Sequence, residues 1–311
     1  MRAVVTGGAG FIGSHLVDRL LADGARVTVV DTLSHAGESN LAAALRSGSC
    51  ALVRHDVAAP GLDEVFAEAA PEAVFHLAAQ IDVRVSVTDP VLDAGSNVVG
   101  TVATLEAARK AGAGKVVFAS SVAVYGPPET LPVTEDAPVN PLSPYATSKL
   151  AGELYLRQYH QLHGMDLTAL AFTNTYGPRQ DPHGEAGVVA IFADALLAGE
   201  PTRVYGDGGN VRDYVYVADV VEALMAAASR SGDGRRLNIG TGQPTTDLQL
   251  HRLVAEAAGS AAEPEFAPAR LGDLREMVLD ASAAREALGW QPRTSLAEGV
   301  KLTVDAFRAA R

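Results

Sequence analysis

A single cysteine, Cys50, occurs in the 311 residues of the chain, so no disulfide can form within it. This argues against a disulfide-stabilised secreted domain and favours a reducing compartment. No apolar run approaches the roughly 18 residues needed to cross a bilayer, and no basic segment with a long apolar one behind it opens the chain. We therefore expect a cytoplasmic protein without a membrane partner.

Positive charge is also scarce. The chain has 25 Lys and Arg residues against 37 Asp and Glu, which gives a net charge of −12 and a pI near 5.1. A nucleic-acid partner is therefore not expected, and an anionic ligand would have to be held by individually placed arginines. What is present is the composition of a globular protein, with 48% apolar residues and 30 glycines. The length suits one large domain or two unequal ones.

A glycine-rich loop lies between a predicted strand at 2–6 and a predicted helix that follows it. Gly7, Gly10 and Gly13 form G-x-x-G-x-x-G, whose glycines permit a tight turn and bring backbone N–H groups close to a pyrophosphate. The helix N-terminus adds a partial positive charge. The order strand, glycine loop, helix predicts a dinucleotide site.

The next predicted strand, residues 26–30, ends at Asp31, which lies 18 residues after Gly13. A carboxylate at this place can accept hydrogen bonds from both hydroxyls of the adenosine ribose. Residues 32–34 contain no Lys or Arg that would pair with a 2′-phosphate, so NAD is favoured over NADP. A simple turn residue at the end of a strand is the other interpretation of Asp31.

Strands continue to alternate with helices as far as residue 172, which predicts an α/β fold: a Rossmann-like, doubly wound parallel sheet with helices on both faces. Beyond that point the pattern loosens, and a smaller mixed α/β C-terminal substrate lobe is expected. We predict an NAD-binding domain at 1–172, to which segments near 206–240 return, and a lobe made mainly from 173–311. The remaining predicted strands are 51–53, 73–77, 115–119, 167–172, 202–205 and 237–239, and the helices are 91–111, 145–163, 187–198, 218–228, 246–258 and 296–309.

Several residues after these strands suit ligand contacts, because ligands of doubly wound sheets bind at the carboxyl ends of the strands. Asp56 and Val57 could meet the adenine edge, although a turn alone would also explain Asp56. The small residues at 78–80 would let backbone pass close to a cofactor. Ser120 and Ser121 place hydroxyls after another strand. His76, inside an apolar strand, is predicted to be a core histidine whose ring nitrogens are satisfied.

One helix carries a tyrosine and a lysine on the same face. Ser143 followed by Pro144 is a helix start, so Tyr145 and Lys149 lie one turn apart. An ammonium group beside a phenol favours the phenolate, and lowering the tyrosine pKa by about 3 units corresponds to roughly 4 kcal/mol. The pair suits a general base in a chain that binds a dinucleotide, although Tyr-x-x-x-Lys alone is also an ordinary exposed helix surface.

With these motifs placed, the sequence resembles the extended short-chain dehydrogenase/reductase family. It is most similar to the NAD-dependent sugar-nucleotide epimerase/dehydratase branch, and within it to the UDP-glucose (UDP-galactose) 4-epimerases. The shared motifs run from Thr-Gly-Gly-Ala-Gly-Phe-Ile-Gly at 6–13 to Leu-Gly-Trp-x-Pro at 288–292. The resemblance implies a permanently held NAD, a nucleotide-sugar substrate, no metal, and a homodimer paired through the helices at about 91–111 and 145–163.

Site roles follow from the same resemblance. Tyr145 matches the catalytic tyrosine, Lys149 the lysine that binds the nicotinamide ribose and lowers the tyrosine pKa, and Ser121 the residue that hydrogen-bonds the sugar 4-hydroxyl. Contacts to NAD are implied for Gly7, Gly10, Phe11, Ile12, Gly13, Asp31, Asp56, Val57, Leu77, Ala78, Ala79, Gln80, Asn97, Ser120, Tyr145, Lys149 and Phe172. Contacts to the substrate are implied for Ser121, Tyr145, Asn174, Val188, Arg212, Arg270 and Asp273. Loop salt bridges are the other interpretation of the last three.

Two departures from the family pattern bear on the reaction. Dehydratases of this branch carry Asp-Glu directly after the catalytic hydroxyl residue, whereas this chain has Val122 and Ala123, which cannot move a proton. Dehydration is therefore not expected. An arginine that usually precedes the asparagine corresponding to Asn174 is also missing, since the chain reads Ala171-Phe172-Thr173-Asn174. This departure affects contacts of the lobe and leaves the chemistry unchanged.

The implied function is NAD-dependent 4-epimerisation of a UDP-hexose of the glucose/galactose type, through a transient 4-keto sugar. An alternative within the branch is 4-epimerisation or decarboxylation of UDP-glucuronate, which would need a pocket for a carboxylate. A non-catalytic NAD-binding regulator is a third interpretation, but Ser121, Tyr145 and Lys149 are all present. A reductase that uses free cofactor would release its NAD on dialysis.

Overall fold

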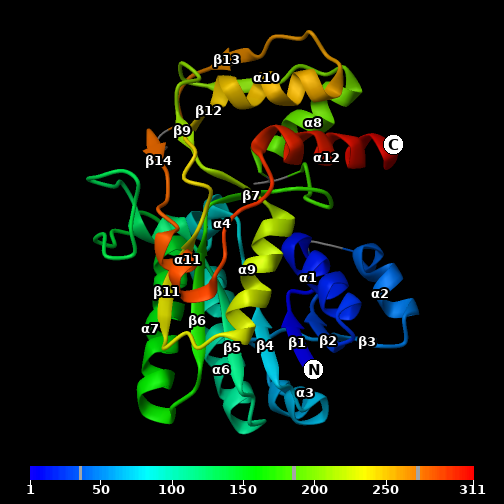
Figure 1. Ribbon diagram of the computed structural model, residues 1–311, viewed down its shortest axis with the longest axis vertical. Coiled ribbons are helices and arrows are strands. Elements are labelled where there is room, and N and C mark those ends of the chain that lie inside the picture. Colours follow the sequence, from blue (N-terminus) through cyan, green and yellow to red (C-terminus); the bar gives the residue numbers. More distant parts are fainter. Residues whose placement is uncertain (35–36, 184–186, 271–273) are drawn as a thin grey trace.

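The computed structural model describes residues 1–34, 37–183, 187–270 and 274–311 (Figure 1). Its centre is a parallel sheet of seven strands in the order β11-β6-β5-β4-β1-β2-β3. The strand order reverses between β1 and β4, as in a doubly wound sheet. The predicted fold class is confirmed. The strands are β1 Arg2–Thr6, β2 Arg26–Asp31, β3 Cys50–Arg54, β4 Ala73–His76, β5 Lys115–Ser121, β6 Leu167–Phe172 and β11 Arg235–Ile239.

Helices cover both faces of this sheet, so its central strands are apolar almost throughout. On one face α1 (Phe11–Ala22) and α9 (Val217–Ser229) pack on the sheet, and α11 (Ser282–Leu288) lies beside them. The opposite face is covered by α3 (Leu62–Ala69), α6 (Gly100–Lys110) and α7 (Pro144–His163). The two layers hold the carboxyl ends of the strands in a fixed arrangement on which a site can be built.

The helix predicted at 91–111 is continuous but not uniform. It consists of α5 (Pro90–Ala94), a π-helical segment (Gly95–Val99) and α6. A π-helical turn is wider than an α-helical one, and such turns occur often at functional sites. Helices α3, α4 (Val83–Thr88) and α11 were not predicted. None has more than 8 residues, which is too short for a clear 3.6-residue pattern.

The start and end of α7 are as predicted. Ser143 caps the helix by accepting a hydrogen bond from the Ala146 N–H at 3.1 Å, and Pro144 occupies its first turn. At the other end Gly164 takes the left-handed conformation, with φ +66°, that closes many helices. Tyr145 and Lys149 therefore lie in the first two turns of a long, well-bounded helix.

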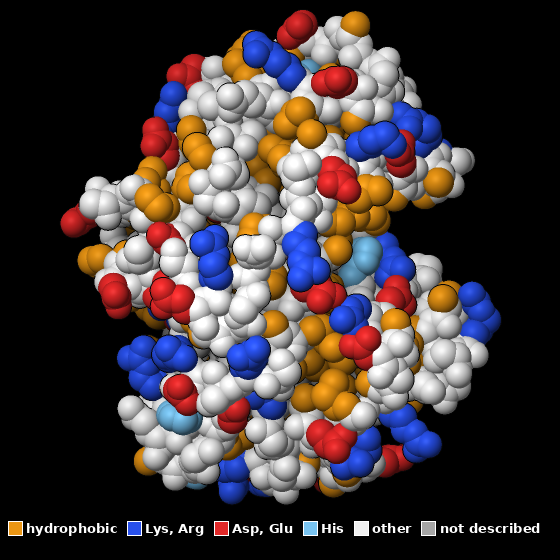
Figure 2. Space-filling view, in the orientation of Figure 1, with side chains coloured by type: hydrophobic (Ala, Val, Ile, Leu, Met, Phe, Trp, Pro, Cys, Tyr) orange, Lys and Arg blue, Asp and Glu red, His pale blue; other side chains and the backbone are white. Residues whose placement is uncertain are grey.

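A second lobe lies over the carboxyl ends of the strands (Figure 1). Helices α8 (Val188–Ala198), α10 (Asp247–Ala258) and α12 (Leu296–Ala309) form its core. Its short strands pair as β10 with β7, β12 with β9 and β14, and β13 with β8. Figure 2 shows the molecule hollowed at the boundary between the lobe and the sheet domain, where hydrophobic side chains gather. The strands are β7 Asn174–Tyr176, β8 Arg203–Tyr205, β9 Val211–Arg212, β10 Tyr214–Tyr216, β12 Thr245–Thr246, β13 Glu265–Ala267 and β14 Glu276–Met277.

The remaining elements are short and connect the larger ones. They are the 3₁₀ turns Glu38–Leu41 and Val122–Tyr125, and the helix α2 Ala42–Arg46. No helix in the described part of the chain is long and apolar enough to cross a bilayer.

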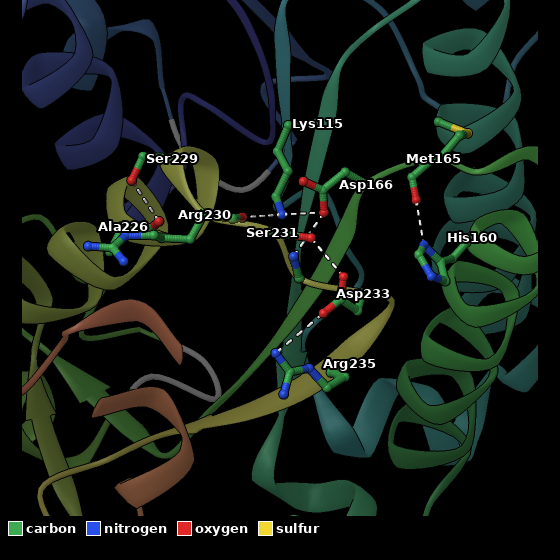
Figure 3. Close-up of polar contacts among 11 residues, drawn as sticks. Lys115, His160, Met165, Asp166, Ala226, Ser229, Arg230, Ser231, Asp233 and Arg235 are labelled. Atoms are coloured by element: carbon green, nitrogen blue, oxygen red, sulfur yellow. Dashed lines mark hydrogen bonds and ion pairs between the residues drawn. The ribbon is translucent and has the colours of Figure 1, made fainter. Parts of the chain in front are cut away.

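A buried lysine at the amino end of β5 joins two neighbouring segments of the chain (Figure 3). Lys115, 5% exposed at the start of β5, donates to Asp166 Oδ1 at 2.8 Å and to the carbonyl of Arg230 at 2.7 Å. Asp166 Oδ1 also accepts from the Gly232 N–H at 2.9 Å. The lysine thus fastens the connection from α9 to β11, the last strand of the main sheet along the chain.

The Leu-Gly-Trp-x-Pro motif near the C-terminus has a structural role. Trp290 donates from its indole N–H to the carbonyl of Asp219 at 2.8 Å. The carboxylate of Asp219 accepts from the N–H groups of Arg293 and Thr294 at 3.1 and 3.0 Å. These bonds attach the segment before α12 to the first turn of α9, and so orient the last helix of the lobe.

Candidate active site

The fold brings together three side chains that the sequence analysis singled out. Ser121 is the last residue of β5, and Tyr145 and Lys149 lie on α7, which packs beside that strand. The Ser121 hydroxyl lies near enough to the Tyr145 phenol to lower the pKa of that phenol. The Lys149 Nζ lies 5.9 Å from the centre of the Tyr145 ring and donates to the carbonyl of Ala119 at 2.9 Å. A hydroxyl, a phenol and an ammonium group therefore meet at the carboxyl end of β5.

Burial acts on the pKa values of this pair in opposite directions. It raises the pKa of Tyr145, and the hydrogen bond from Ser121 opposes that rise. It lowers the pKa of Lys149 to about 8, and the negative charges of Asp93 and Glu153 oppose that fall. Burial removes water from both groups and so disfavours the phenolate of Tyr145 and the ammonium form of Lys149. Ionisable groups with such shifted pKa values are typical of sites that transfer protons to or from a ligand.

The side chain of Ser120 bonds to a different residue of α7. Its hydroxyl donates to the buried carboxylate of Glu153, and the other oxygen of Glu153 accepts from Arg236 Nε at 2.8 Å. The Arg236 guanidinium also lies over the Tyr125 ring, 4.9 Å from its centre. The side chain of Ser120 is thus used in a network that joins β5, α7 and β11, so a contact with NAD would fall to its backbone.

The glycine loop has room for backbone only. A Cβ atom on Gly13 would lie 2.2 Å from the carbonyl oxygen of Gly7, and one on Gly7, whose φ is +70°, would lie 2.6 Å from the N–H nitrogen of Ala78. No side chain caps α1, whose N-cap is Gly10. The N–H groups of the first turn, at Phe11, Ile12 and Gly13, are therefore left for an outside acceptor. These features fit a pyrophosphate.

Asp31 lies beside this loop at the end of β2. Its Oδ2 accepts from the Ala9 N–H at 3.0 Å and its Oδ1 from the Leu33 N–H at 2.8 Å. Each carboxylate oxygen keeps a lone pair for a further donor. The half-buried carboxylate is thus held in place against the glycine loop, as a contact to ribose hydroxyls requires.

Asn97 supports the loop after β4. Its side-chain oxygen accepts from the Gln80 N–H at 2.8 Å, and its amide group donates to the Gln80 carbonyl at 2.9 Å. Leu77, Ala78 and Ala79 are partly exposed, while Asn97 is 2% exposed. The predicted residues of this group are therefore brought together, with the backbone of 77–79 open to a ligand and Asn97 behind it.

The other predicted cofactor residues lie at neighbouring strand ends. Asp56 is exposed and accepts from the Ala58 N–H at 2.8 Å, so a turn already uses part of its carboxylate. Val57 is buried against Gly100, where a Cβ would lie 2.8 Å from Val57 Cγ2. Phe172, buried at the end of β6, is paired in register with Ser121.

His76 is a satisfied core residue, as predicted. Its Nδ1 lies 2.7 Å from Thr6 Oγ1 and its Nε2 lies 3.0 Å from Thr101 Oγ1. Thr101 donates its own hydroxyl hydrogen to the Asn97 carbonyl at 2.6 Å, so it accepts from Nε2 and the ring is protonated there. Burial, with Lys149 nearby, lowers the pKa of His76 to about 3. The ring is neutral and plays no acid–base part.

The predicted substrate residues belong to the lobe and its junction with the sheet. Asn174 begins β7, Val188 begins α8, and Arg212 lies on β9 between β12 and β14; all three are partly buried. The Arg270 guanidinium lies 3.8 Å from the centre of the Tyr205 ring. Asp273 lies outside the described residues. In the described part of the chain no contact joins Arg212 to Arg270, so the structure places them in one lobe without linking them.

Two residues of this lobe were missed. Asp213, fully buried, accepts from the N–H groups of Thr241 and Gly242 at 2.9 and 3.0 Å and thereby holds a loop beside Arg212. Its place in Val-Arg-Asp-Tyr was visible in the sequence, but its burial was not. The flat ring of Tyr205 lies beside the Arg270 guanidinium. In the sequence, only its position at the end of a short predicted strand before Gly206 pointed to this residue.

Comparisons with known proteins agree with this geometry. Residues 3–240 match the family described as "NAD dependent epimerase/dehydratase family". A UDP-glucose 4-epimerase of Mycolicibacterium smegmatis is 55% identical over 309 residues, which is 99% of each chain. The crystal structure of a UDP-glucose 4-epimerase of Thermotoga maritima with UDP-glucose has a TM-score of 0.96, 44% identity and coverage of 100% of this chain and 99% of that chain. A Thermus thermophilus UDP-glucose 4-epimerase in complex with NAD has a TM-score of 0.92 and 47% identity, with both chains fully covered.

Proposed function

The chain belongs to the NAD dependent epimerase/dehydratase family, and we propose that it is an NAD-dependent 4-epimerase that interconverts UDP-glucose and UDP-galactose. The observation that carries this proposal is the meeting of Ser121, Tyr145 and Lys149 beside a glycine loop. The 4-epimerases with UDP-glucose and with NAD that resemble the whole chain support the choice of substrate and cofactor.

The residues around the glycine loop fit NAD. The close backbone packing at Gly7 and Gly13 and the uncapped start of α1 suit its pyrophosphate, and Asp31 suits the adenosine ribose. A 2′-phosphate would meet the negative charge of Asp31, so NADP is disfavoured. When bound, NAD supplies a hydride acceptor and donor for carbon 4 of the sugar.

Three side chains of the site bind the sugar hydroxyl and transfer its proton. Ser121 hydrogen-bonds the sugar 4-hydroxyl and directs its proton to Tyr145. Tyr145, as phenolate, accepts that proton and returns it after the 4-keto sugar has turned over. Lys149 stabilises the phenolate through its positive charge and holds the cofactor ribose. The net result is inversion at carbon 4, with no net oxidation of the sugar.

Turnover of the sugar requires that binding be concentrated on the nucleotide. Arg212 and Arg270 supply positive charge for the diphosphate and ribose, and Asn174 at the start of β7 and Val188 at the start of α8 are proposed to contact the rest of the substrate. Asp273 completes the proposed contacts. We assign residues 1–172, with segments near 206–240, to NAD, and mainly the rest of 173–311 to the nucleotide sugar.

A dehydratase reaction does not fit the residues after Ser121. Val122 and Ala123 begin the 3₁₀ turn that follows β5, and neither can transfer a proton. A UDP-glucuronate 4-epimerase or decarboxylase would use the same Ser121, Tyr145 and Lys149 and is the second candidate. Testing UDP-glucuronate beside UDP-glucose separates the two.

A homodimer in the cytoplasm is part of the proposal. Side chains on the surface formed by α4, α5, the π-helical segment and α7 are apolar and exposed, which supports pairing of this face with a second copy. They are Val87, Val91, Leu92, Val99, Leu154 and Leu162. The single cysteine supports a reducing compartment.

The direct test is to incubate the purified protein, without added NAD, with UDP-galactose and to follow the sugar signals by NMR. Appearance of UDP-glucose is the expected result, and it would also demonstrate a tightly held cofactor. Tyr145→Phe is the control, since it should give no conversion with NAD still bound. Absence of conversion by the wild-type protein, with bound NAD visible by absorbance, would count against this substrate.

A further inference from the structure

A carboxylate without an assigned role is buried next to the candidate active site. Asp93, on α5, is 1% exposed, and its Oδ2 has no hydrogen-bond partner among the described residues. Burying a carboxylate is costly unless each oxygen is bonded, so an unpartnered one calls for a reason beyond packing.

Hydrogen bonds connect Asp93 to the turn of α7 that bears the catalytic pair. Its Oδ1 accepts from Gln80 Nε2 at 3.2 Å and from Asn97 Nδ2 at 3.0 Å. The same Asn97 nitrogen lies 3.1 Å from Ser148 Oγ, which in turn donates to the carbonyl of Tyr145 at 2.9 Å. Since α5 and the π-helical segment pack directly against α7, the carboxylate lies close behind Tyr145 and Lys149.

We propose that Asp93 is a buried counter-charge for Lys149, and that it sets the pH range in which the Tyr145–Lys149 pair works. It is a positioning residue, because it acts through Asn97 and through the charge of Lys149 and does not touch the reacting atoms. This inference rests on the proposed function, in which that pair moves the proton.

Of the other ionisable groups around Lys149, one carboxylate is already paired with a cation and one histidine is neutral. Glu153, one turn further along α7, is already paired with Arg236 and Ser120. His76, on β4, is neutral because burial holds its pKa near 3. Asp93 forms no ion pair with another described residue, so its negative charge is left to act on Lys149.

The groups on the elements around Asp93 lie nearer to solvent. Asp82, which caps α4, is partly exposed, while Arg84 and Asp89 are exposed. Charges at the surface are screened by water and salt much more than buried ones. The charge of Asp93 should thus have a far larger effect on Lys149 than any of these three.

Removing the negative charge of Asp93 should change the pKa values of Tyr145 and Lys149 in the same direction. The negative charge of Asp93 raises the pKa of Lys149 and also raises the pKa of Tyr145. Asp93→Asn should therefore move the acid and alkaline limbs of the pH–rate profile together to lower pH, because Tyr145 and Lys149 would both lose their protons more readily. The expected displacement is about one unit. A purely structural defect would lower the rate without moving both limbs together.

The experiment compares Asp93→Asn with Asp93→Glu, which keeps the charge, and with Asp89→Asn. Asp89 is the matched control because it is an exposed carboxylate four residues away that caps α5 through the Leu92 N–H at 2.9 Å, and asparagine caps equally well. Only Asp93→Asn should move the limbs. Asp93→Ser, which leaves room for water, repeats the test should the asparagine variant not fold.

A second readout does not depend on catalysis. The pH titration of tyrosinate absorbance, taken as the difference between each protein and the same protein carrying Tyr145→Phe, reports Tyr145 alone. Asp93→Asn should lower its midpoint by about one unit. A shifted midpoint in a protein that converts no UDP-sugar would leave the role of Asp93 intact and defeat the proposed function. An unshifted midpoint and unshifted limbs, or an equal shift in Asp89→Asn, would overturn the inference.

Discussion

At the scale of single residues, the hydroxyl of Tyr145 should decide activity. Tyr145→Phe removes the proton acceptor and keeps the ring, so turnover should fall by about 10³-fold, in the usual range for loss of a general base. The half-buried ring remains in place, and NAD content and thermal unfolding should be unchanged. The measurements are the rate of UDP-galactose conversion and the absorbance of bound cofactor. Activity within tenfold of the wild type would refute the assignment.

The pKa of Lys149 should determine how the turnover rate depends on pH. Burial lowers the pKa of Lys149 to about 8, so its ammonium group is lost as the pH rises through that value. Since the ammonium group stabilises the Tyr145 phenolate, kcat should fall above about pH 8. Lys149→Arg stays charged throughout this range and should remove the alkaline limb, even at a reduced rate. An unchanged alkaline limb in that variant would assign the limb to another group.

The sequence predicted the places of Tyr145 and Lys149 in the fold better than it predicted the side chains that hold them. Tyr145 and Lys149 were placed correctly because helix spacing and a Ser-Pro start are local signals. The contact of Ser120 with NAD stays a prediction, and the bond from its hydroxyl to Glu153, a partner 33 positions away, is one that no local pattern reveals. Asp213 and Asp93 were missed because their meaning lies in burial, which depends on the packing of distant segments.

At the scale of elements, the turn from β1 into α1 should tolerate no side chain. In Gly13→Ala the new Cβ would lie 2.2 Å from the carbonyl oxygen of Gly7 and 2.7 Å from Gly8 Cα, both of which are backbone atoms that cannot move independently. We expect NAD affinity to fall at least tenfold and the free energy of unfolding to fall by about 1–3 kcal/mol. Isothermal titration with NAD and urea unfolding would measure these effects.

Gly95→Ala is the matched control for this change. Gly95 is helical, and its Cβ would meet nothing within 4 Å. Alanine is favoured over glycine in a helix, so this variant should be neutral or more stable by up to about 1 kcal/mol. Equal loss of NAD affinity in both variants would show that crowding at Gly13 is not the cause.

The π-helical segment is a local feature that the sequence did not predict. Apolar periodicity predicted one helix at about 91–111, and the helix is there, but a widened turn at Gly95–Val99 cannot be read from a 3.6-residue pattern. The widening accompanies Asn97, whose side chain holds both backbone groups of Gln80. The strands of the main sheet were predicted more accurately, because those of a doubly covered sheet are nearly continuous apolar runs. Most of the short strands of the lobe were not predicted.

At the scale of the whole molecule, the apolar face of α4, α5, the π-helical segment and α7 should control assembly. Val91 is 80% exposed and Leu162 is 75% exposed, an unusual place for large aliphatic side chains in a monomer. A charge introduced at the centre of such a face would be buried without a partner on pairing. The wild-type protein is expected to be a dimer by analytical ultracentrifugation, and Val91→Glu combined with Leu162→Glu should therefore give a monomer.

The lobe provides the matched control for assembly. Phe266, on β13, is 60% exposed and lies far from α7 in the fold, so Phe266→Glu removes a large apolar side chain from the surface without touching the proposed interface. It should leave the mass of the particle unchanged. Because α7 also carries Tyr145 and Lys149, separating the two copies should loosen the helix and lower turnover. A Val91→Glu, Leu162→Glu protein that remains dimeric would place the contact between copies on another face.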